Sequence, residues 1–146
     1  MRDLPPSDFS LKFTPSPTTL FRFSALTFNG HHIHLDRNYA QETEGYPGKL
    51  VVVCGHDFCG HTGIKITERL VHGPLTALML LETFAFYHPK VQMSSFEYRA
   101  LNPVVVNREL TFHGSRTGLE EMILWVQDRA GTVGMRGKVS FEHGSI

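Results

Sequence analysis

Residues 73–87 read Gly-Pro-Leu-Thr-Ala-Leu-Met-Leu-Leu-Glu-Thr-Phe-Ala-Phe-Tyr, and this stretch decides the fold. Only two threonines and one glutamate interrupt its large apolar side chains. It predicts a helix that is apolar nearly all round and must therefore be surrounded by protein. Pro74 suits the first turn, where its missing N–H has no helical partner, and His88-Pro89 ends the helix. We expect five of its side chains to touch a sheet: Leu75, Leu78, Met79, Leu81 and Phe86.

Only strand signals follow this helix. Segments rich in β-branched and aromatic residues are separated by the turn signals Asn102-Pro103, Arg116-Thr117-Gly118 and Arg129-Ala130-Gly131. Short connections between successive strands favour an antiparallel meander. One buried helix followed by such strands is best packed by a sheet that wraps the helix. The predicted fold class is therefore α+β, with the hot-dog architecture. The predicted strands are Val91–Ala100, Glu109–Ser115, Met122–Asp128 and Thr132–Glu142.

The segment before the central helix is interpreted from its prolines and its apolar run. Four prolines within residues 1–17 predict an extended lead-in, and residues 18–146 are expected to form a single domain. The run Thr18–Phe28 is dense in large apolar groups and predicts a helix, although its alternation also permits a strand. Thr18 or Thr19 is the expected cap, and Asn29-Gly30 ends the element.

Composition limits the classes of function. The chain has 146 residues, 41% of them hydrophobic, which suits one packed domain. With 14 Lys and Arg against 14 Asp and Glu, the formal net charge is zero. This balance removes the electrostatic argument for nucleic acid or an anionic membrane as a partner. No apolar run is long enough to span a bilayer and no targeting peptide is visible, so we expect an intracellular protein.

One candidate site combines the histidine-rich loop Asn29–Asp36 with the start of the central helix. A histidine such as His34, preceded by the amide of Asn29, can position and deprotonate a water molecule. The N–H of Gly73 and the helix dipole suit a thioester carbonyl that becomes an enolate oxyanion. A loop histidine bonded to backbone and an ordinary helix-start glycine are the open alternatives. Asp36 is expected to cap a short helix rather than to act in catalysis.

A second cluster, Cys54, His56, Cys59 and His61, offers two sulfurs and two imidazoles in one short segment. Zinc needs its ligands in a tetrahedral array, and structural zinc sites usually draw them from two well-separated pairs. No second pair of this kind lies elsewhere in the chain. We therefore predict no metal site and interpret the segment as a glycine-rich loop.

Three motifs stand in order along the chain. They are Leu-Phe-Arg-Phe-Ser-Ala-Leu-Thr-Phe-Asn-Gly-His-His-Ile-His-Leu-Asp at residues 20–36, Glu-Gly-Tyr-Pro at 44–47 and Leu-Val-His-Gly-Pro-Leu at 70–75. Together they closely resemble the MaoC-like hydratase/dehydratase family. Within that family the chain resembles the C-terminal hot-dog half of the branch that holds mitochondrial 3-hydroxyacyl-thioester dehydratases and mesaconyl-C4-CoA hydratases. The resemblance implies a hydro-lyase that adds or removes water at a 2-enoyl or 3-hydroxyacyl thioester.

The resemblance also assigns roles to individual residues. His34 matches the family's catalytic histidine, and Gly73 matches the glycine whose amide binds the thioester carbonyl. Asn29 stands where most of these hydratases carry a catalytic aspartate, so the proton chemistry falls on His34 while Asn29 orients the water. His72, Gly73 and Pro74 are implied to bind the substrate, and no cofactor is implied.

Partners and compartment follow from the same resemblance. The substrate is expected to be a thioester of CoA or of acyl-carrier protein, with the acyl chain and the carrier left open. Relatives in this branch usually carry two hot-dog halves, with the site formed between paired hot-dogs. We therefore expect a homodimer or a pairing with a second hot-dog. The resemblance favours a mitochondrial location.

One segment departs from the family pattern. Removing Gly48–Thr67 joins Glu-Gly-Tyr-Pro to Glu-Arg-Leu-Val-His-Gly, which reads as a natural family sequence. We predict that these residues are an insertion that projects as a weakly packed loop. Translated intron sequence is an alternative origin, because Gly48-Lys49 and Thr67-Glu68 permit splice-like codons.

Two other functions are compatible with the sequence. A hot-dog thioesterase would use a carboxylate near the central helix, but Glu82, the only acid in that helix, lies about three turns from its start. The other is a non-catalytic half that binds acyl thioesters or a partner subunit, because the chain resembles only one of the two halves.

Overall fold

The computed structural model describes residues 4–42 and 68–142, which divide into two compact units. The sheet unit contains the described residues up to Phe13, together with Gly73–Leu101 and the chain from Glu109 onward. The histidine unit contains the described residues of Thr14–His72, together with Asn102–Arg108. The insertion predicted at Gly48–Thr67, which includes the cluster of Cys54, His56, Cys59 and His61, lies outside the described residues.

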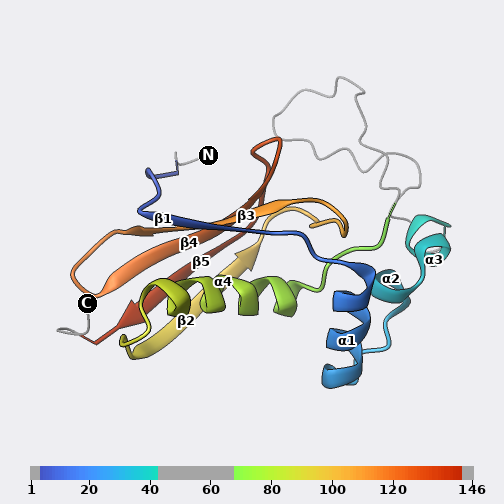
Figure 1. Ribbon diagram of the computed structural model, residues 1–146, viewed down its shortest axis with the longest axis horizontal. Helices are drawn as coiled ribbons and strands as arrows, with labels where there is room; N and C mark the ends of the chain where they lie inside the picture. Colours follow the sequence, from blue (N-terminus) through green and yellow to red (C-terminus); the bar gives the residue numbers. More distant parts are fainter. Residues whose placement is uncertain (1–3, 43–67, 143–146) are drawn as a thin grey trace. The chain divides into compact units, whose positions relative to one another are not determined.

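The sheet unit holds one antiparallel sheet with the strand order β1-β3-β4-β5-β2 (Figure 1). The four strands predicted after the central helix are all present, with ends within two residues of those expected. The predicted α+β class with an antiparallel sheet is therefore confirmed. The strands are β1 (Phe9–Phe13), β2 (Met93–Ala100), β3 (Leu110–Arg116), β4 (Glu121–Asp128) and β5 (Val133–Phe141).

Two features of the sheet differ from the prediction. β3, β4 and β5 form the expected meander, but β2 pairs with β5 instead of β3. The reason is that the chain does not turn back after β2, because residues 102–108 belong to the histidine unit and pair there with residues 69–71. In addition, part of the extended lead-in forms β1, which pairs with β3 from Phe9↔Gly114 to Phe13↔Leu110.

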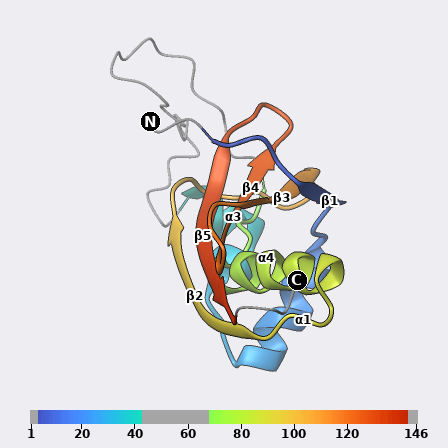
Figure 2. The same cartoon turned by 90° about the vertical axis from the view of Figure 1, so that its left-hand side faces the viewer.

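Helix α4 runs over Gly73–Tyr87, the range that the sequence predicts. It contacts β1, β3, β4 and β5, and Figure 2 shows the sheet curving around it. The expectation that the helix is enclosed on all sides is wrong, because Leu78 and Phe86 expose 46% and 70% of their surface. The buried residues of α4 are Leu75, Thr76, Ala77, Leu80, Thr83 and Phe84.

The buried face of α4 therefore includes two threonines that hydropathy alone would place outside. Thr83 is tolerated there because its Oγ1 donates to the carbonyl oxygen of Met79 at 2.7 Å. A hydroxyl that bonds its own helix leaves no unsatisfied donor, so its burial costs little. Both faces of α4 carry large apolar side chains, so the packing of the sheet and not the hydropathy pattern decides which face is buried.

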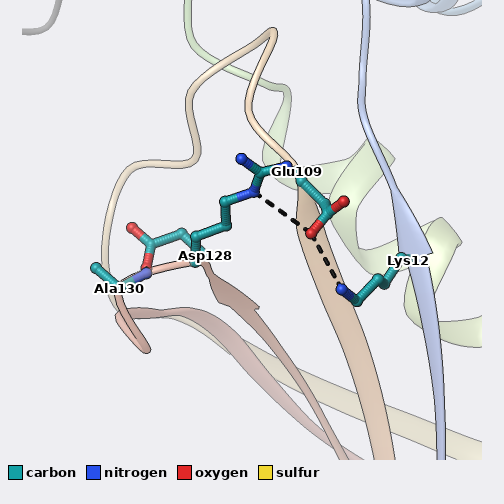
Figure 3. Close-up of polar contacts among 5 residues, drawn as sticks. Lys12, Glu109, Asp128 and Ala130 are labelled. Carbon is teal, nitrogen blue, oxygen red and sulfur yellow. Dashed lines mark hydrogen bonds and ion pairs between the residues drawn. The ribbon is translucent and has the colours of Figure 1, made fainter.

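A charged cluster links β1 to the turn between β4 and β5 (Figure 3). Glu109 Oε1 accepts hydrogen bonds from Lys12 Nζ at 3.2 Å and from Arg129 Nε at 3.4 Å. Arg129 and then Lys12 lower the pKa of Glu109 from its ordinary value. In the same turn, Asp128 Oδ1 accepts the backbone N–H of Ala130 at 2.9 Å, which orders the connection. Exposed ion pairs of this kind contribute little to stability.

The histidine unit contains three helices, α1 (Pro17–Thr27), α2 (His32–Leu35) and α3 (Arg37–Glu42). The predicted helix of this region is confirmed, but its cap is Ser16 and not a threonine. Ser16 Oγ accepts the N–H of Thr19 at 3.1 Å, and Pro17 fills the first helical position. The single turn of α2 lies where the sequence predicts a loop.

A short backbone ladder completes this unit. Val71 N–H donates to Val104 O at 2.8 Å, and Leu70 forms an isolated bridge with Val105. Leu70 N–H also donates to Ile33 O at 3.2 Å, which ties the segment before α4 to α2. The buried cluster Ile33, Ala40, Leu70 and Val105 packs behind these bonds. The ladder thus holds residues 70–72 against the histidine-rich turn.

Candidate active site

The loop after α1 sets the entry to the histidine-rich turn. Phe28 caps α1 in the left-handed region, with φ of 53°, and Asn29 N–H donates to Ser24 O at 2.9 Å. Asn29 Oδ1 then accepts the N–H of His31 at 3.1 Å, as in an Asx turn. The predicted break at Asn29-Gly30 is therefore confirmed, and the Asn29 side chain orders the start of α2.

His34 is half-buried on α2 and is oriented by the segment before α4. Its Nδ1 lies 2.9 Å from the carbonyl oxygen of Leu70. Because a carbonyl oxygen only accepts, Nδ1 carries the proton in this bond. The neutral ring then presents its lone pair at Nε2, which is the form a general base requires.

The electrostatic setting keeps that ring neutral near neutral pH. Burial lowers the pKa of His34 from its ordinary value of 6.5, and the neighbouring His31 adds to this effect. The hydrogen bond to the Leu70 carbonyl raises the pKa and opposes the other two, but the lowering is larger. The lowered pKa thus favours the neutral imidazole, and the bond to Leu70 keeps its proton on Nδ1.

His72 lies directly against His34. The two rings stack with centroids 3.7 Å apart and an interplanar angle of 23°. His72 is fully buried, its Nε2 lies 2.8 Å from Ser24 Oγ, and the ring of Phe23 meets it edge-on at 5.0 Å. Burial and then His34 lower the pKa of His72 to about 4, so both stacked rings are neutral at neutral pH.

The other polar residues of this loop have structural roles. Asp36 Oδ1 accepts the N–H groups of Asn38 at 2.8 Å and Tyr39 at 3.0 Å, which confirms that Asp36 caps α3. His31 and His32 are both exposed. The ring of His32 lies 5.0 Å from that of Tyr39, whereas the ring of His31 lies 6.0 Å from that of His34.

Gly73 and Pro74 are the first residues of α4 and belong to the sheet unit. A Cβ built on Gly73 meets none of the described atoms within 4 Å, so nothing in the described chain requires a glycine there. The expectation that Asn29, His34 and the Gly73 N–H face one cavity stays a prediction. Glu82, the carboxylate weighed for a thioesterase, is exposed on α4.

The described residues form neither a metal-binding cluster nor a membrane-spanning helix. Within residues 4–42 and 68–142, no three histidine, cysteine or acidic side chains gather closely enough to hold a metal ion. The cluster of Cys54, His56, Cys59 and His61 lies outside these ranges. Among the helices of the described chain, none has the length and apolar character needed to cross a bilayer.

Sequence reasoning missed two parts of this site, the Ser24 hydroxyl and the Leu70 carbonyl. Leu20 and Ser24 are four residues apart and so share one face of a helix, but the sequence does not show that this face of α1 is the buried one. A serine on the buried stripe of an amphipathic helix indicates a polar partner in the interior. Nothing in the sequence indicates Leu70, because its role lies in a backbone atom.

Comparison with known proteins identifies related sequences and folds. A family model described as hydroxyacyl-thioester dehydratase type 2 matches residues 2–53 and 61–106. Mesaconyl-C(4)-CoA hydratase of Chloroflexus aurantiacus is 40% identical over 104 residues, which are 70% of this chain and 30% of that protein. The mitochondrial hydroxyacyl-thioester dehydratase type 2 of Schizosaccharomyces pombe is 35% identical over 108 residues, 73% of this chain and 29% of that one.

The chain thus spans less than a third of the length of these two curated relatives. Among solved structures, an unliganded R-hydratase from Pseudomonas aeruginosa superposes with a TM-score of 0.68 at 17% identity. The match covers 94% of this chain and 81% of that one, and it confirms the hot-dog fold.

Proposed function

Because the chain belongs to the hydroxyacyl-thioester dehydratase type 2 family, as its motifs predict, we propose that it is a hydro-lyase acting on acyl thioesters. It adds water to a 2-enoyl thioester or removes water from a 3-hydroxyacyl thioester, with His34 as the general base. The observation that carries this proposal is the bond from His34 Nδ1 to the Leu70 carbonyl, which directs the lone pair to Nε2.

In the hydration direction, His34 Nε2 takes a proton from water as the water oxygen bonds to C3 of the enoyl group. The electrons of the C2=C3 bond move toward the thioester carbonyl and form an enolate, whose oxygen accepts a hydrogen bond from the Gly73 N–H. The imidazolium of His34 then returns the proton to C2, which regenerates the neutral ring. Dehydration follows the same steps in reverse.

Asn29 and the residues at the start of α4 have supporting roles in this proposal. Asn29 Oδ1 already accepts the His31 N–H, so the amide NH₂ is the group that orients the water by donating to it. Gly73 and Pro74 line the thioester carbonyl. Contact of His72 with substrate stays a prediction, and its buried side chain supports His34 from behind.

A second hot-dog is part of the proposal, as a second copy of this chain or as another chain. β2 is the last strand in the sheet order, so its outer edge pairs with no strand of the described chain. Exposed apolar side chains are available for such a pairing, Met93 and Tyr98 on β2 and Leu78 and Phe86 on α4. Light scattering on the purified protein tests this, since a monomeric mass would contradict a homodimer and leave pairing with another chain.

The thioester is carried by CoA or by acyl-carrier protein, and we place the protein in mitochondria. The location is supported by the name of the Schizosaccharomyces pombe relative, which is mitochondrial. Fluorescence imaging of the tagged full-length protein beside a mitochondrial marker tests it, and a diffuse cytosolic signal would contradict it.

The decisive experiment measures hydration of crotonyl-CoA by the full chain and by two histidine variants. His34→Ala removes the base and should lower kcat by about 10²–10⁴-fold. His32→Ala is the matched control, because it removes an exposed imidazole from the same helical turn, and it should retain full activity.

Three results would contradict the proposed function or the role of His34 in it. A folded wild-type chain without hydration activity would favour the non-catalytic half that binds thioesters. Release of free CoA thiol without hydration would favour the thioesterase, and Glu82→Gln would then be expected to stop the release. Equal activity of His34→Ala and His32→Ala would remove His34 from the mechanism.

A further inference from the structure

Ser24 is the one polar residue among the two buried residues of α1, and only 5% of its surface is exposed. Hydroxyls on helices usually bond back to a carbonyl of their own helix, as Thr27 Oγ1 does to Phe23 O at 2.7 Å. Ser24 Oγ instead reaches a residue 48 positions away in the sequence, His72 Nε2, at 2.8 Å. A buried polar contact of this range fixes the two groups in one geometry.

Two routes lead from Ser24 to His34. The first passes through side chains, because the Ser24 hydroxyl holds the His72 ring and that ring stacks on His34 at 3.7 Å. The second passes along the loop. Asn29 N–H donates to Ser24 O, Asn29 Oδ1 accepts the His31 N–H, and His34 N–H donates to His31 O at 3.1 Å.

We propose that Ser24 is a positioning residue for the general base: its hydroxyl fixes the ring of His72, and the stacked ring fixes the imidazole of His34. The inference rests on the proposed role of His34. Stacking leaves the His34 ring free to slide in its own plane, while the Leu70 carbonyl fixes only Nδ1. The face of the buried His72 ring fixes the plane of the His34 ring. The stack and the Leu70 bond together therefore orient His34 Nε2 in one direction.

Few titratable groups among the described residues lie near His34. A change in the pKa of His34 can therefore be attributed to the loss of the Ser24 hydroxyl. Of the described side chains near it, His72 and His31 are the titratable ones that meet its ring. Glu68, on the segment that leads to Leu70, pairs with Arg69 at 3.6 Å and with Arg37 of α3 at 3.7 Å. If His72 is no longer held, water reaches His34 and the pKa of His34 rises toward its ordinary value.

The test compares Ser24→Thr with Ser24→Val, which differ by one hydroxyl at equal size. The threonine variant should keep kcat and the pH profile of the wild type. In the valine variant, kcat on crotonyl-CoA should fall by about 10–100-fold with KM within about twofold. The acid limb of its kcat/KM profile should also move to higher pH. Thr27→Ala, which deletes another hydroxyl from the same helix, should change neither quantity.

A second readout does not depend on turnover. Imidazole ¹⁵N resonances of His34 and His72, followed over pH, should move in the valine variant and stay in place in the threonine variant. If Ser24→Thr and Ser24→Val both unfold at a much lower temperature than the wild type, Ser24→Ala, which adds no volume, can be compared with the wild type instead.

The outcomes separate the two proposals. Unchanged resonances and an unchanged acid limb in Ser24→Val or Ser24→Ala would overturn the positioning role, even where His34→Ala is inactive. Shifted resonances together with an active His34→Ala would support the link from Ser24 to His34 and instead contradict His34 as the base.

Discussion

The two units have different kinds of interior. In the sheet unit the fully buried side chains are mainly apolar, as with Leu80, Phe84 and Phe112, and they are held by contact area. In the histidine unit Ser24 and His72 are buried together, and they are held by a hydrogen bond of defined direction. Apolar packing has no preferred direction and survives small displacements of a side chain. A buried hydrogen bond is directional, so a similar displacement leaves a donor or acceptor unsatisfied. Damage to the first interior should therefore cost stability, and damage to the second should change protonation and activity.

The largest effect on stability should come from the sheet unit. Phe84→Ala empties a fully buried position on α4 and should lower the free energy of unfolding by about 3–5 kcal/mol. Phe86→Ala, two residues further on, changes a side chain that is 70% exposed and should cost less than about 0.5 kcal/mol. Urea denaturation measures both.

Both variants should be denatured at two protein concentrations, because Phe86 belongs to the surface proposed to pair with a second hot-dog. Similar losses for the two phenylalanines at the lower concentration would mean that both faces of α4 are buried. That result would restore the fully enclosed helix that the sequence predicts.

The histidine unit should produce a pH-dependent loss of smaller size. The pKa of His72 is about 4 in the folded chain, against an ordinary value of 6.5. Between these pH values His72 is protonated in the unfolded chain and neutral in the folded chain. The stability contributed by neutral His72 is fully present above pH 6.5 and is lost as the pH falls toward 4. The shift corresponds to at most about 3 kcal/mol.

His72→Gln isolates this contribution. It should flatten the fall of unfolding free energy between pH 6.5 and 4, although it also lowers stability at pH 7 by breaking the bond to Ser24. His34, His88 and His113 keep a residual slope, because burial also lowers the pKa of each. An equal slope in wild type and variant would mean that His72 is not buried as a neutral ring.

The same contrast explains how far the sequence could predict the molecule. Hydropathy and turn residues predicted α4 and four strands, because their periods are local properties of the chain. They could not predict that β2 pairs with β5, because that depends on where residues 102–108 pair outside the sheet. They also placed Leu78 and Phe86 against the sheet, because an all-apolar helix carries no sign of which face is covered.

For the site, motifs indicated His34 and Asn29 but not what holds them. Asp36 was predicted as a cap because capping is a local property. The contact of Ser24 with His72 joins residues 48 positions apart, and the Leu70 carbonyl has no side-chain signature. Both depend on tertiary structure, so only the folded chain reveals them.

The smallest expected effect concerns Asn29, where the loop geometry and the chemistry can be separated. Asn29→Ala removes both the oxygen that accepts the His31 N–H and the amide that orients water, so crotonyl-CoA hydration should fall by about tenfold. The loss of activity is smaller than that expected for His34→Ala, because the general base itself remains. Asn29→Asp keeps the oxygen that accepts the His31 N–H, and its second carboxylate oxygen orients the water by accepting from it where the amide donates, so this variant should retain most of the activity. If Asp and Ala variants are equally impaired, the amide N–H₂ is the essential group. If both are fully active, Asn29 serves neither the loop nor the water, and the turn of α2 is ordered by its backbone bonds alone.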